Sequence, residues 1–323
     1  MVKACICGTS ALELYRASGR LLPDVLANKR TAKLAECGVP AAAMLKDDML
    51  RFGVKKEPFH LLLAKEVGGR KRDDVVCHRV LGPVAPRSLI KVSKDYMVTG
   101  PELTFLGLAA LTTYDEVDLA LIGYELCGTY VLDTSWDGLT NTQSPMTCRA
   151  SIARVLSHQS GCSGVVKARK ALELVRDGSN SPMETVLCAL LTFPRRLGGY
   201  ALGPVSLNYQ VSTGLGTRYI DLAFPACKVG LEYKGKEYHS VERAGRDDRR
   251  QNEITGSGWT ILNVWYEDLV EEHLFDRLIQ ELARAMGIRI RIRSEAFAAR
   301  RALLRARLMP AVMKFGDGSG MGA

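Results

Sequence analysis

The chain has 323 residues, of which 47% are hydrophobic and 24% are charged, and its formal net charge is +9. This composition is typical of a folded protein and excludes disordered, collagen-like and low-complexity classes. Because single cores seldom exceed about 250 residues, the length predicts more than one domain. No apolar run approaches the roughly 18 residues of a membrane span, and the first residues show no signal-peptide pattern. We therefore expect a cytoplasmic protein without membrane contact.

The sequence of the first half predicts a smaller N-terminal α+β domain over residues 1–150, with a regulatory or recognition role. About the first 40 residues have a helical pattern, with Ser10 at an N-cap position. Apolar runs predict strands at 59–64, 75–81 and 89–98, and a helix at 101–111. From 133 to about 151 the chain is rich in Ser, Thr, Asn and Gly without apolar periodicity, which predicts a connection between domains.

The second half predicts a mixed β-sheet core flanked by helices over residues 151–288. A helical segment at 153–176 is followed by signals in the order α-β-β-α-β. This order is typical of an α/β or α+β core. Nine scattered cysteines contain no C-x-x-C pair, which favours reduced thiols over a disulfide framework or a zinc ribbon.

Residues 289–323 form an arginine-rich segment, expected to be a helix with a flexible tail. It holds eight Lys and Arg residues against two acids, which leaves +6 of the net charge. Such a segment favours binding to nucleic acid, because Lys and Arg side chains that neutralise phosphates release the counterions bound there. The alternative is a helix docked on the protein through Phe297, Leu304 and Leu308, which lie at helical spacing. The candidate phosphate contacts in this segment are Arg300, Arg301 and Arg305.

A hairpin with acids on both strands is the clearest chemical feature. Residues 218–224 and 228–234 predict two strands joined by a turn. Glu232 and Lys234 are two residues apart and project to the same side of their strand, where Asp221 can face them. Neighbouring carboxylates repel unless a cation lies between them, and hard ions such as Mg²⁺ bind these oxygens. An ordinary surface hairpin with cross-strand charge pairs is the alternative.

These residue types suit metal-assisted hydrolysis of a phosphodiester. The metal ion polarises a phosphoryl oxygen and lowers the pKa of a bound water, while a nearby cation stabilises the charge of the transition state. The spacing of Asp221, Glu232 and Lys234 also matches the P-D…(D/E)-x-K nuclease motif. Around it, about a third of the chain resembles the very-short-patch-repair-like branch of that superfamily. The elements shared in order are Glu232-Tyr233-Lys234-Gly235, His239, Asp247 to Arg250, and Gly258-Trp259.

This resemblance implies a restriction-endonuclease-like fold and a metal-dependent endonuclease. It implies Asp221 and Glu232 as ligands of Mg²⁺, or of Mn²⁺, and Lys234 as the catalytic cation. Two positions depart from the branch: Ile220 stands where the motif has proline, and many relatives carry Asp at the position of Lys234. DNA is the favoured substrate, and a ribonuclease or a non-catalytic nucleic-acid-binding or antitoxin-type regulatory protein on the same fold are the alternatives.

Further residues near the motif each have two interpretations. Ser181 and Glu184 fit a capping box, and in nuclease relatives an acid on this helix can also face the metal. His239 is either structural or an acid–base or phosphate-binding group. Arg250 lies one helical turn from Asp247 and forms a supporting pair with it, or joins Arg249 in contacting a backbone phosphate.

Two segments of the first half carry a second resemblance. Residues 101–106 and 124–130 are similar to parts of proteins related to abortive-infection antitoxin regulators. In those proteins a comparable region precedes a nuclease-like domain. The resemblance implies phage defence or toxin–antitoxin biology, with a protein partner. The residues alone allow a plainer interpretation, in which Gly128 ends a helix.

Overall fold

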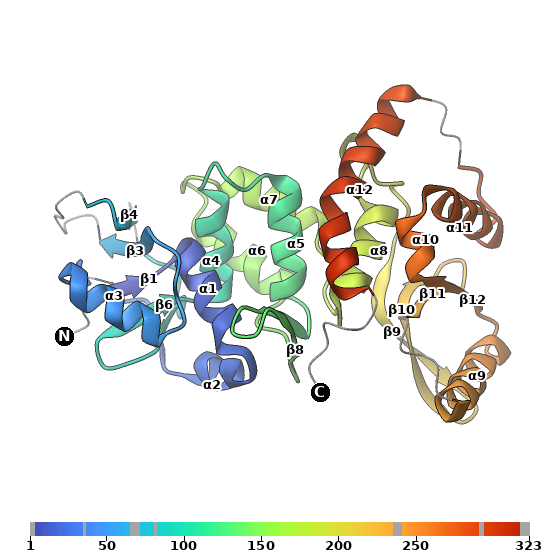
Figure 1. Ribbon diagram of the computed structural model, residues 1–323, viewed down its shortest axis with the longest axis horizontal. Coiled ribbons are helices and arrows are strands. Elements are labelled where there is room, and N and C mark those ends of the chain that lie inside the picture. The colour runs from blue at the N-terminus through green and yellow to red at the C-terminus, as the bar shows by residue number, and fades with distance from the viewer. Residues whose placement is uncertain are drawn as a thin grey trace. The chain divides into compact units, whose positions relative to one another are not determined.

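The computed structural model describes residues 4–34, 37–64, 72–80, 83–234, 241–290 and 294–316, without the side chains of 241–248. The chain divides into two compact units, Met1–Val175 and Arg176–Ala323 (Figure 1). Both units combine helices with β-strands, so the expected mixed α/β class is confirmed. The first unit is the larger of the two, contrary to the prediction of a smaller N-terminal domain.

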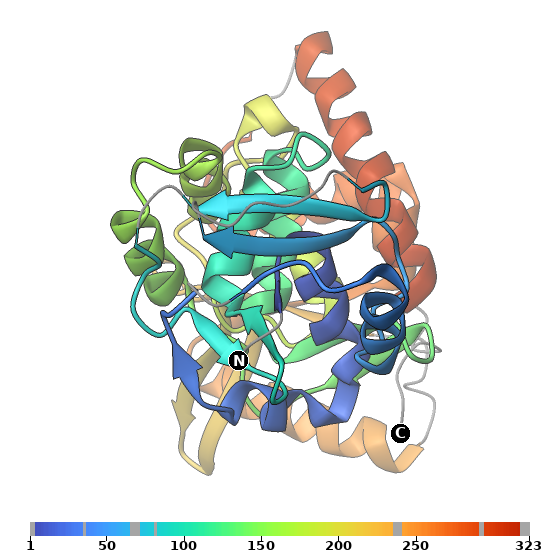
Figure 2. The same cartoon turned by 90° about the vertical axis from the view of Figure 1, so that its left-hand side faces the viewer.

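A six-stranded mixed sheet forms the centre of the first unit, in the order β2-β5-β6-β1-β3-β4. Strand β1 pairs in parallel with β6 and antiparallel with β3, and Figure 2 shows β3 and β4 side by side with the same direction. The strands are β1 (Ala4–Ile6), β2 (Arg30–Thr31), β3 (Phe59–Ala64), β4 (Val75–Val80), β5 (Leu89–Lys91) and β6 (Tyr96–Thr99). The sequence missed β1, whose three residues are fully buried in the middle of the sheet.

The helices of the first unit pack against the sheet and against one another. They are α1 (Gly8–Ser18), η1 (Gly19–Leu21), α2 (Leu22–Ala27), α3 (Ala42–Arg51), α4 (Pro101–Ala109), α5 (Glu116–Leu126), α6 (Arg149–His158) and α7 (Val165–Leu174). A hairpin of β7 (Tyr130–Asp133) and β8 (Gly138–Asn141) begins before the segment expected to be a connection and extends into it. The predicted helix at 153–176 is divided between α6 and α7, before which Gly164 adopts a φ of +82°. Because both helices pack on α4, the boundary falls at 175 and not at 150.

The second unit is built on a four-stranded sheet with the order β12-β11-β10-β9. Strands β9 (Ser206–Thr213), β10 (Gly216–Phe224) and β11 (Val229–Lys234) are antiparallel, and β12 (Thr260–Trp265) is parallel to β11. The predicted hairpin is therefore present as β10 and β11. Between β11 and β12 the chain forms α9 (Val241–Gly256), whose Ile254 packs in one apolar cluster with Ile220 and Trp259.

The remaining helices of the second unit are α8 (Pro182–Thr192), η2 (Arg195–Leu197), α10 (Tyr266–Val270), α11 (Glu272–Ala285) and α12 (Glu295–Phe315). Helix α12 packs against α8, η2 and α10, and Figure 1 shows α12 beside α8. Phe297, Leu304 and Leu308 are at most 4% exposed, so these side chains attach α12 to the unit. The docked helix is thus the interpretation that the structure supports for the arginine-rich segment.

Candidate active site

Asp221 lies where β10 separates from β11. Pairing of the two strands runs from Phe224–Val229 to Leu222–Leu231. At the next position Asp221 Oδ2 accepts a hydrogen bond from the backbone N–H of Tyr233 at 3.0 Å. The carboxylate thus provides the acceptor that a strand carbonyl would otherwise supply. This bond fixes Asp221 against β11, next to Glu232.

Glu232 on β11 is buried between two cations. Its side chain accepts a hydrogen bond from Lys234 Nζ at 3.0 Å through Oε2 and from an Arg250 guanidinium nitrogen at 3.0 Å through Oε1. Glu232 is 2% exposed and Lys234 is 8% exposed. A carboxylate this deep requires paired positive charge and hydrogen bonds. The predicted meeting of Glu232 and Lys234 on one side of the strand is confirmed.

Glu184 belongs to the first turn of α8 and is part of its N-terminal cap. Ser181 Oγ accepts a hydrogen bond from the Glu184 backbone N–H at 3.1 Å, which confirms the predicted N-cap. The Glu184 carboxylate accepts hydrogen bonds from the backbone N–H of Asn180 at 2.9 Å and from Asn208 Nδ2 at 2.7 Å. In a capping box the side chain of the acid accepts a hydrogen bond from the backbone N–H of the N-cap residue. Here Glu184 accepts this bond from Asn180, the residue before Ser181. Capping alone leaves the contact with Asn208 unexplained.

The three acids interact electrostatically. Burial, followed by the charge of Asp221, raises the pKa of Glu184 from 4.5 to about 8. Burial, followed by the charge of Glu232, raises the pKa of Asp221 from 3.8 to about 6. Asp221 is thus close enough to both glutamates for each pair to repel. The structure therefore places Asp221 within electrostatic reach of each of the two glutamates that the sequence proposes as metal ligands.

This donor set fits a hard divalent cation. Carboxylate oxygens are the ligands that Mg²⁺ and Mn²⁺ prefer, and a cation between the acids would relieve their repulsion. In the described part of the chain, however, no three His, Cys, Asp or Glu side chains already converge as a metal site. The contacts give the reason. Lys234 and Arg250 hold the two oxygens of Glu232. Asn180 and Asn208 donate to Oε2 of Glu184, and Ser181 Oγ donates to its Oε1.

Helix α9 brings one of the two predicted phosphate-binding arginines into the site. Arg250 contacts Glu232 and also donates to the Tyr219 carbonyl on β10 at 2.6 Å. Arg249 is exposed on the same helix. His239 and the side chain of Asp247 lie outside what the structure describes.

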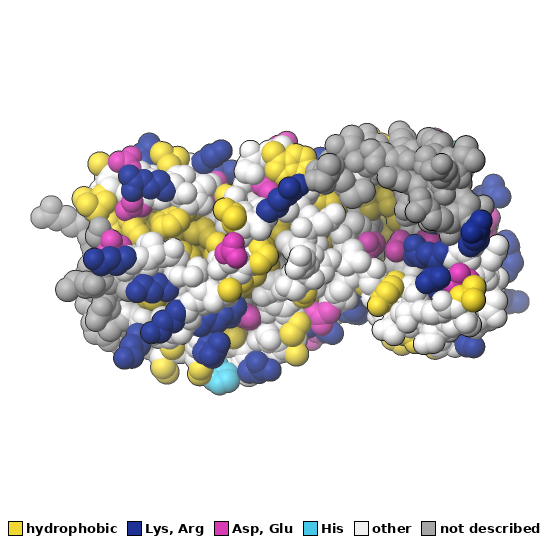
Figure 3. All heavy atoms as spheres, turned by 90° about the horizontal axis from the view of Figure 1, so that it is seen from below, with side chains coloured by type: hydrophobic (Ala, Val, Ile, Leu, Met, Phe, Trp, Pro, Cys, Tyr) yellow, Lys and Arg dark blue, Asp and Glu magenta, His cyan; other side chains and the backbone are white. Residues whose placement is uncertain are grey.

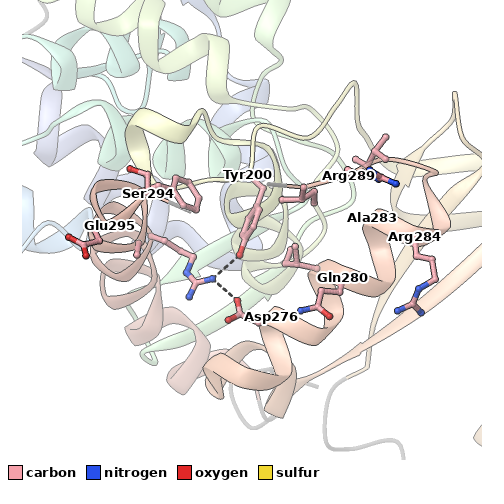
Figure 4. A pocket seen from close by; sticks show the side chains of 14 residues that line it. Tyr200, Asp276, Gln280, Ala283, Arg284, Arg289, Ser294 and Glu295 are labelled. Atoms are coloured by element: carbon pink, nitrogen blue, oxygen red, sulfur yellow. Dashed lines mark hydrogen bonds and ion pairs between the residues drawn. The ribbon is translucent and has the colours of Figure 1, made fainter. Parts of the chain in front are cut away.

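The arginines of α12 are mostly committed to intramolecular contacts, so the predicted phosphate-binding role is a poor fit for them. Arg305 is 8% exposed and donates to the Leu269 carbonyl at 2.8 Å. Arg301 donates to Tyr200 Oη at 3.0 Å and pairs with Asp276, as Figure 4 shows. Arg300 is exposed but donates to the Arg195 carbonyl at 3.2 Å. These arginines contact residues that are distant in the sequence, and the composition of the segment does not reveal such partners.

Basic side chains also lie on the surface of the first unit that Figure 3 draws. On this face of the first unit, Lys and Arg side chains are scattered among neutral and apolar ones. The acids in the two segments with the second resemblance are buried there. Glu125 pairs with Arg16 at 2.5 Å, and Glu102 accepts a hydrogen bond from Thr147 Oγ1 at 2.7 Å. These contacts give both acids a structural role.

Two residues of the site were not found from the sequence. Asn208 on β9 adopts a φ of +45° and bridges Glu184 to the Gly178 carbonyl. An asparagine within a strand pattern is the signal that could have indicated it, because Asn tolerates this backbone region. Tyr233 donates its backbone N–H to Asp221 and its hydroxyl to the Gly316 carbonyl at 2.6 Å, so it connects the site to the end of α12.

Comparison with known proteins identifies no relative. No family model, no curated protein and no solved structure matches the chain. Among the described helices, none combines the length and the apolar character needed to cross a bilayer.

Proposed function

We propose that the second unit is an Mg²⁺-dependent endonuclease that hydrolyses phosphodiester bonds of nucleic acid, with DNA favoured over RNA. The observation that supports this proposal is the meeting of Asp221, Glu232 and Lys234 beside the buried Glu184. Carboxylates that repel one another are costly to bury. A reaction that depends on a bound metal cation would account for the presence of these acids around one lysine. The restriction-endonuclease-like arrangement implied by the motif is part of the same proposal.

Each residue has a chemical role in this reaction. A divalent cation held by Asp221 and Glu232, with Glu184 alongside, would polarise a phosphoryl oxygen and lower the pKa of a water. Lys234 stabilises the negative charge that develops on the phosphate. Its ammonium group is held at 3.0 Å from Glu232 Oε2, and its low exposure strengthens its electrostatic effect. The hydrogen bond from Tyr233 orients Asp221 before the substrate arrives.

A cleavage assay tests the proposal. The purified chain is incubated with plasmid DNA and with labelled RNA, in Mg²⁺, Mn²⁺ or EDTA, beside Glu232→Gln. Glu253→Gln is the matched control, because Glu253 pairs with Arg218 between α9 and β10 and does not contact Glu232. We expect metal-dependent cleavage that Glu232→Gln abolishes and Glu253→Gln retains. Equal cleavage by wild type and Glu232→Gln would remove these residues from the mechanism.

A second candidate is a nucleic-acid-binding or antitoxin-type regulatory protein without catalysis. The observation that favours it is the neutralisation of both Glu232 oxygens by Lys234 and Arg250. Binding that persists in EDTA and weakens with salt, without cleavage in any metal, would support this function over the first. In either case we propose that the first unit recognises a protein partner in a defence or toxin–antitoxin system.

A further inference from the structure

Arg250 connects three elements around the catalytic glutamate. From α9 it reaches the Tyr219 carbonyl on β10 at 2.6 Å and Glu232 Oε1 on β11 at 3.0 Å. One guanidinium nitrogen makes both bonds. The contact with Glu232 is therefore not the bidentate geometry that makes Arg–carboxylate pairs strongest. Arg250 holds Glu232 in place through a bond that can be exchanged.

The two cations bound to Glu232 differ in their access to solvent. The side chain of Lys234 is 10% exposed, whereas that of Arg250 is 35% exposed. Lys234 is enclosed and lies two positions from Glu232 on the same strand. Arg250 reaches the carboxylate from helix α9 and keeps about a third of its side chain exposed. Of the two partners, Arg250 is the more accessible to solvent and to a substrate.

A divalent cation would add positive charge to a site that already holds two cations. Lys234 and Arg250 both contact Glu232, so a divalent ion beside the same carboxylate would repel both side chains. The phosphodiester of a substrate would supply the negative charge that attracts one of them. Arg250 is then no longer needed to neutralise Glu232, and an arginine is well suited to bind a phosphate.

We infer that Arg250 occupies the position of the metal ion at Glu232 and moves to the substrate phosphate when the metal binds. This inference rests on the proposed nuclease function and adds to it a residue that regulates metal binding. The residue that would bind the phosphate is thus the one that holds Glu232 until a metal ion replaces it. It also accounts for the absence, among the described residues, of a preformed group of three metal ligands.

The test measures Mn²⁺ binding by titration calorimetry on the full chain without nucleic acid. The variant is Arg250→Met, which keeps the apolar stem and removes the charge. Arg218→Met is the matched control, since Arg218 pairs with Glu253 at 2.8 Å and also joins β10 to α9. We expect Arg250→Met to bind Mn²⁺ about fivefold more tightly than wild type, the factor for losing one partly exposed ion pair. Arg218→Met should bind as wild type does.

Cleavage at saturating Mn²⁺ provides the second readout. Arg250→Met should cleave at least about tenfold more slowly than Arg218→Met, because the arginine is missing from the phosphate. Circular dichroism checks that each variant folds. Arg250→Lys replaces the Met variant if the latter does not fold, and we expect it also to bind Mn²⁺ more tightly than wild type, because the shorter side chain reaches Glu232 less well.

The outcomes separate the inference from the function on which it rests. Mn²⁺ binding by wild type that Arg250→Met leaves unchanged or weakens would overturn the inference alone. Absence of Mn²⁺ binding in wild type and in every variant would overturn the proposed function, and the inference with it.

Discussion

Replacing Glu184 by Gln should raise the stability of the protein at neutral pH and reduce its dependence on pH. Burial and the Asp221 charge raise the pKa of Glu184 from 4.5 to about 8 in the folded chain. The folded carboxyl thus keeps a proton that the unfolded one releases. The free energy of unfolding is highest below pH 4.5 and decreases as pH rises through about 8. At about 1.4 kcal/mol per pKa unit, this loss is about 3 kcal/mol by pH 7.

Urea unfolding in EDTA, from about pH 5 to about pH 8, measures this effect. The amide oxygen of the glutamine introduced by Glu184→Gln can still accept hydrogen bonds from Asn180 and Asn208, so the cap is retained. We expect the stability gain of Glu184→Gln over wild type to grow by about 3 kcal/mol across the range. Glu281→Gln, which changes a glutamate that is 37% exposed and paired with Arg277, should show no such growth. A gain for Glu184→Gln that is constant with pH would refute the reasoning.

Three further outcomes test the packing and charges described above. Gly107→Ala should stabilise the first unit by about 0.5 to 1 kcal/mol, since its new Cβ meets nothing nearer than 3.7 Å. Gly123→Ala should destabilise the same unit, because its Cβ would lie 2.5 Å from a Val175 methyl. Thermal unfolding compares the two variants, and a Gly123→Ala variant more stable than wild type would contradict this packing. Leu308→Ala should cost about 2 to 5 kcal/mol in urea unfolding, and an unchanged midpoint would mean that α12 is a free arm. His60, whose pKa burial and a neighbouring histidine lower to about 4, should lose its stabilising effect as pH falls from 6.5 towards 4; an imidazole NMR titration midpoint near 6.5 would disprove this.

The core of the candidate site could be predicted from the sequence because it depends on local geometry. Alternation along a strand places Glu232 and Lys234 on one side, and the short turn after Phe224 brings Asp221 to the neighbouring strand. The N-cap at Ser181 is equally local. These relations need only a few residues of sequence. The contact of Arg250 with Glu232 additionally requires the position of α9 on the sheet, which no short pattern specifies.

The arginines of α12 show what a sequence pattern does not contain. A run of arginines has the same composition whether it meets phosphates or the acids of another helix. Asp276, which pairs with Arg301, is 25 residues earlier in the chain. The strand Ala4–Ile6 was missed for a related reason, since three residues are too few to show a period. In both cases the deciding partners are contributed by distant segments.

The position of α12 has a consequence for protein synthesis. This helix follows every other described element of the second unit, yet it packs on α8 and its Gly316 carbonyl accepts the hydroxyl hydrogen bond of Tyr233. A nascent chain that has already exposed β9 to β12 still lacks these contacts. The positioning of Glu184 and Asp221 is therefore completed only when α12 has left the ribosome. For a nuclease, such an order would keep the growing chain inactive until α12 is in place.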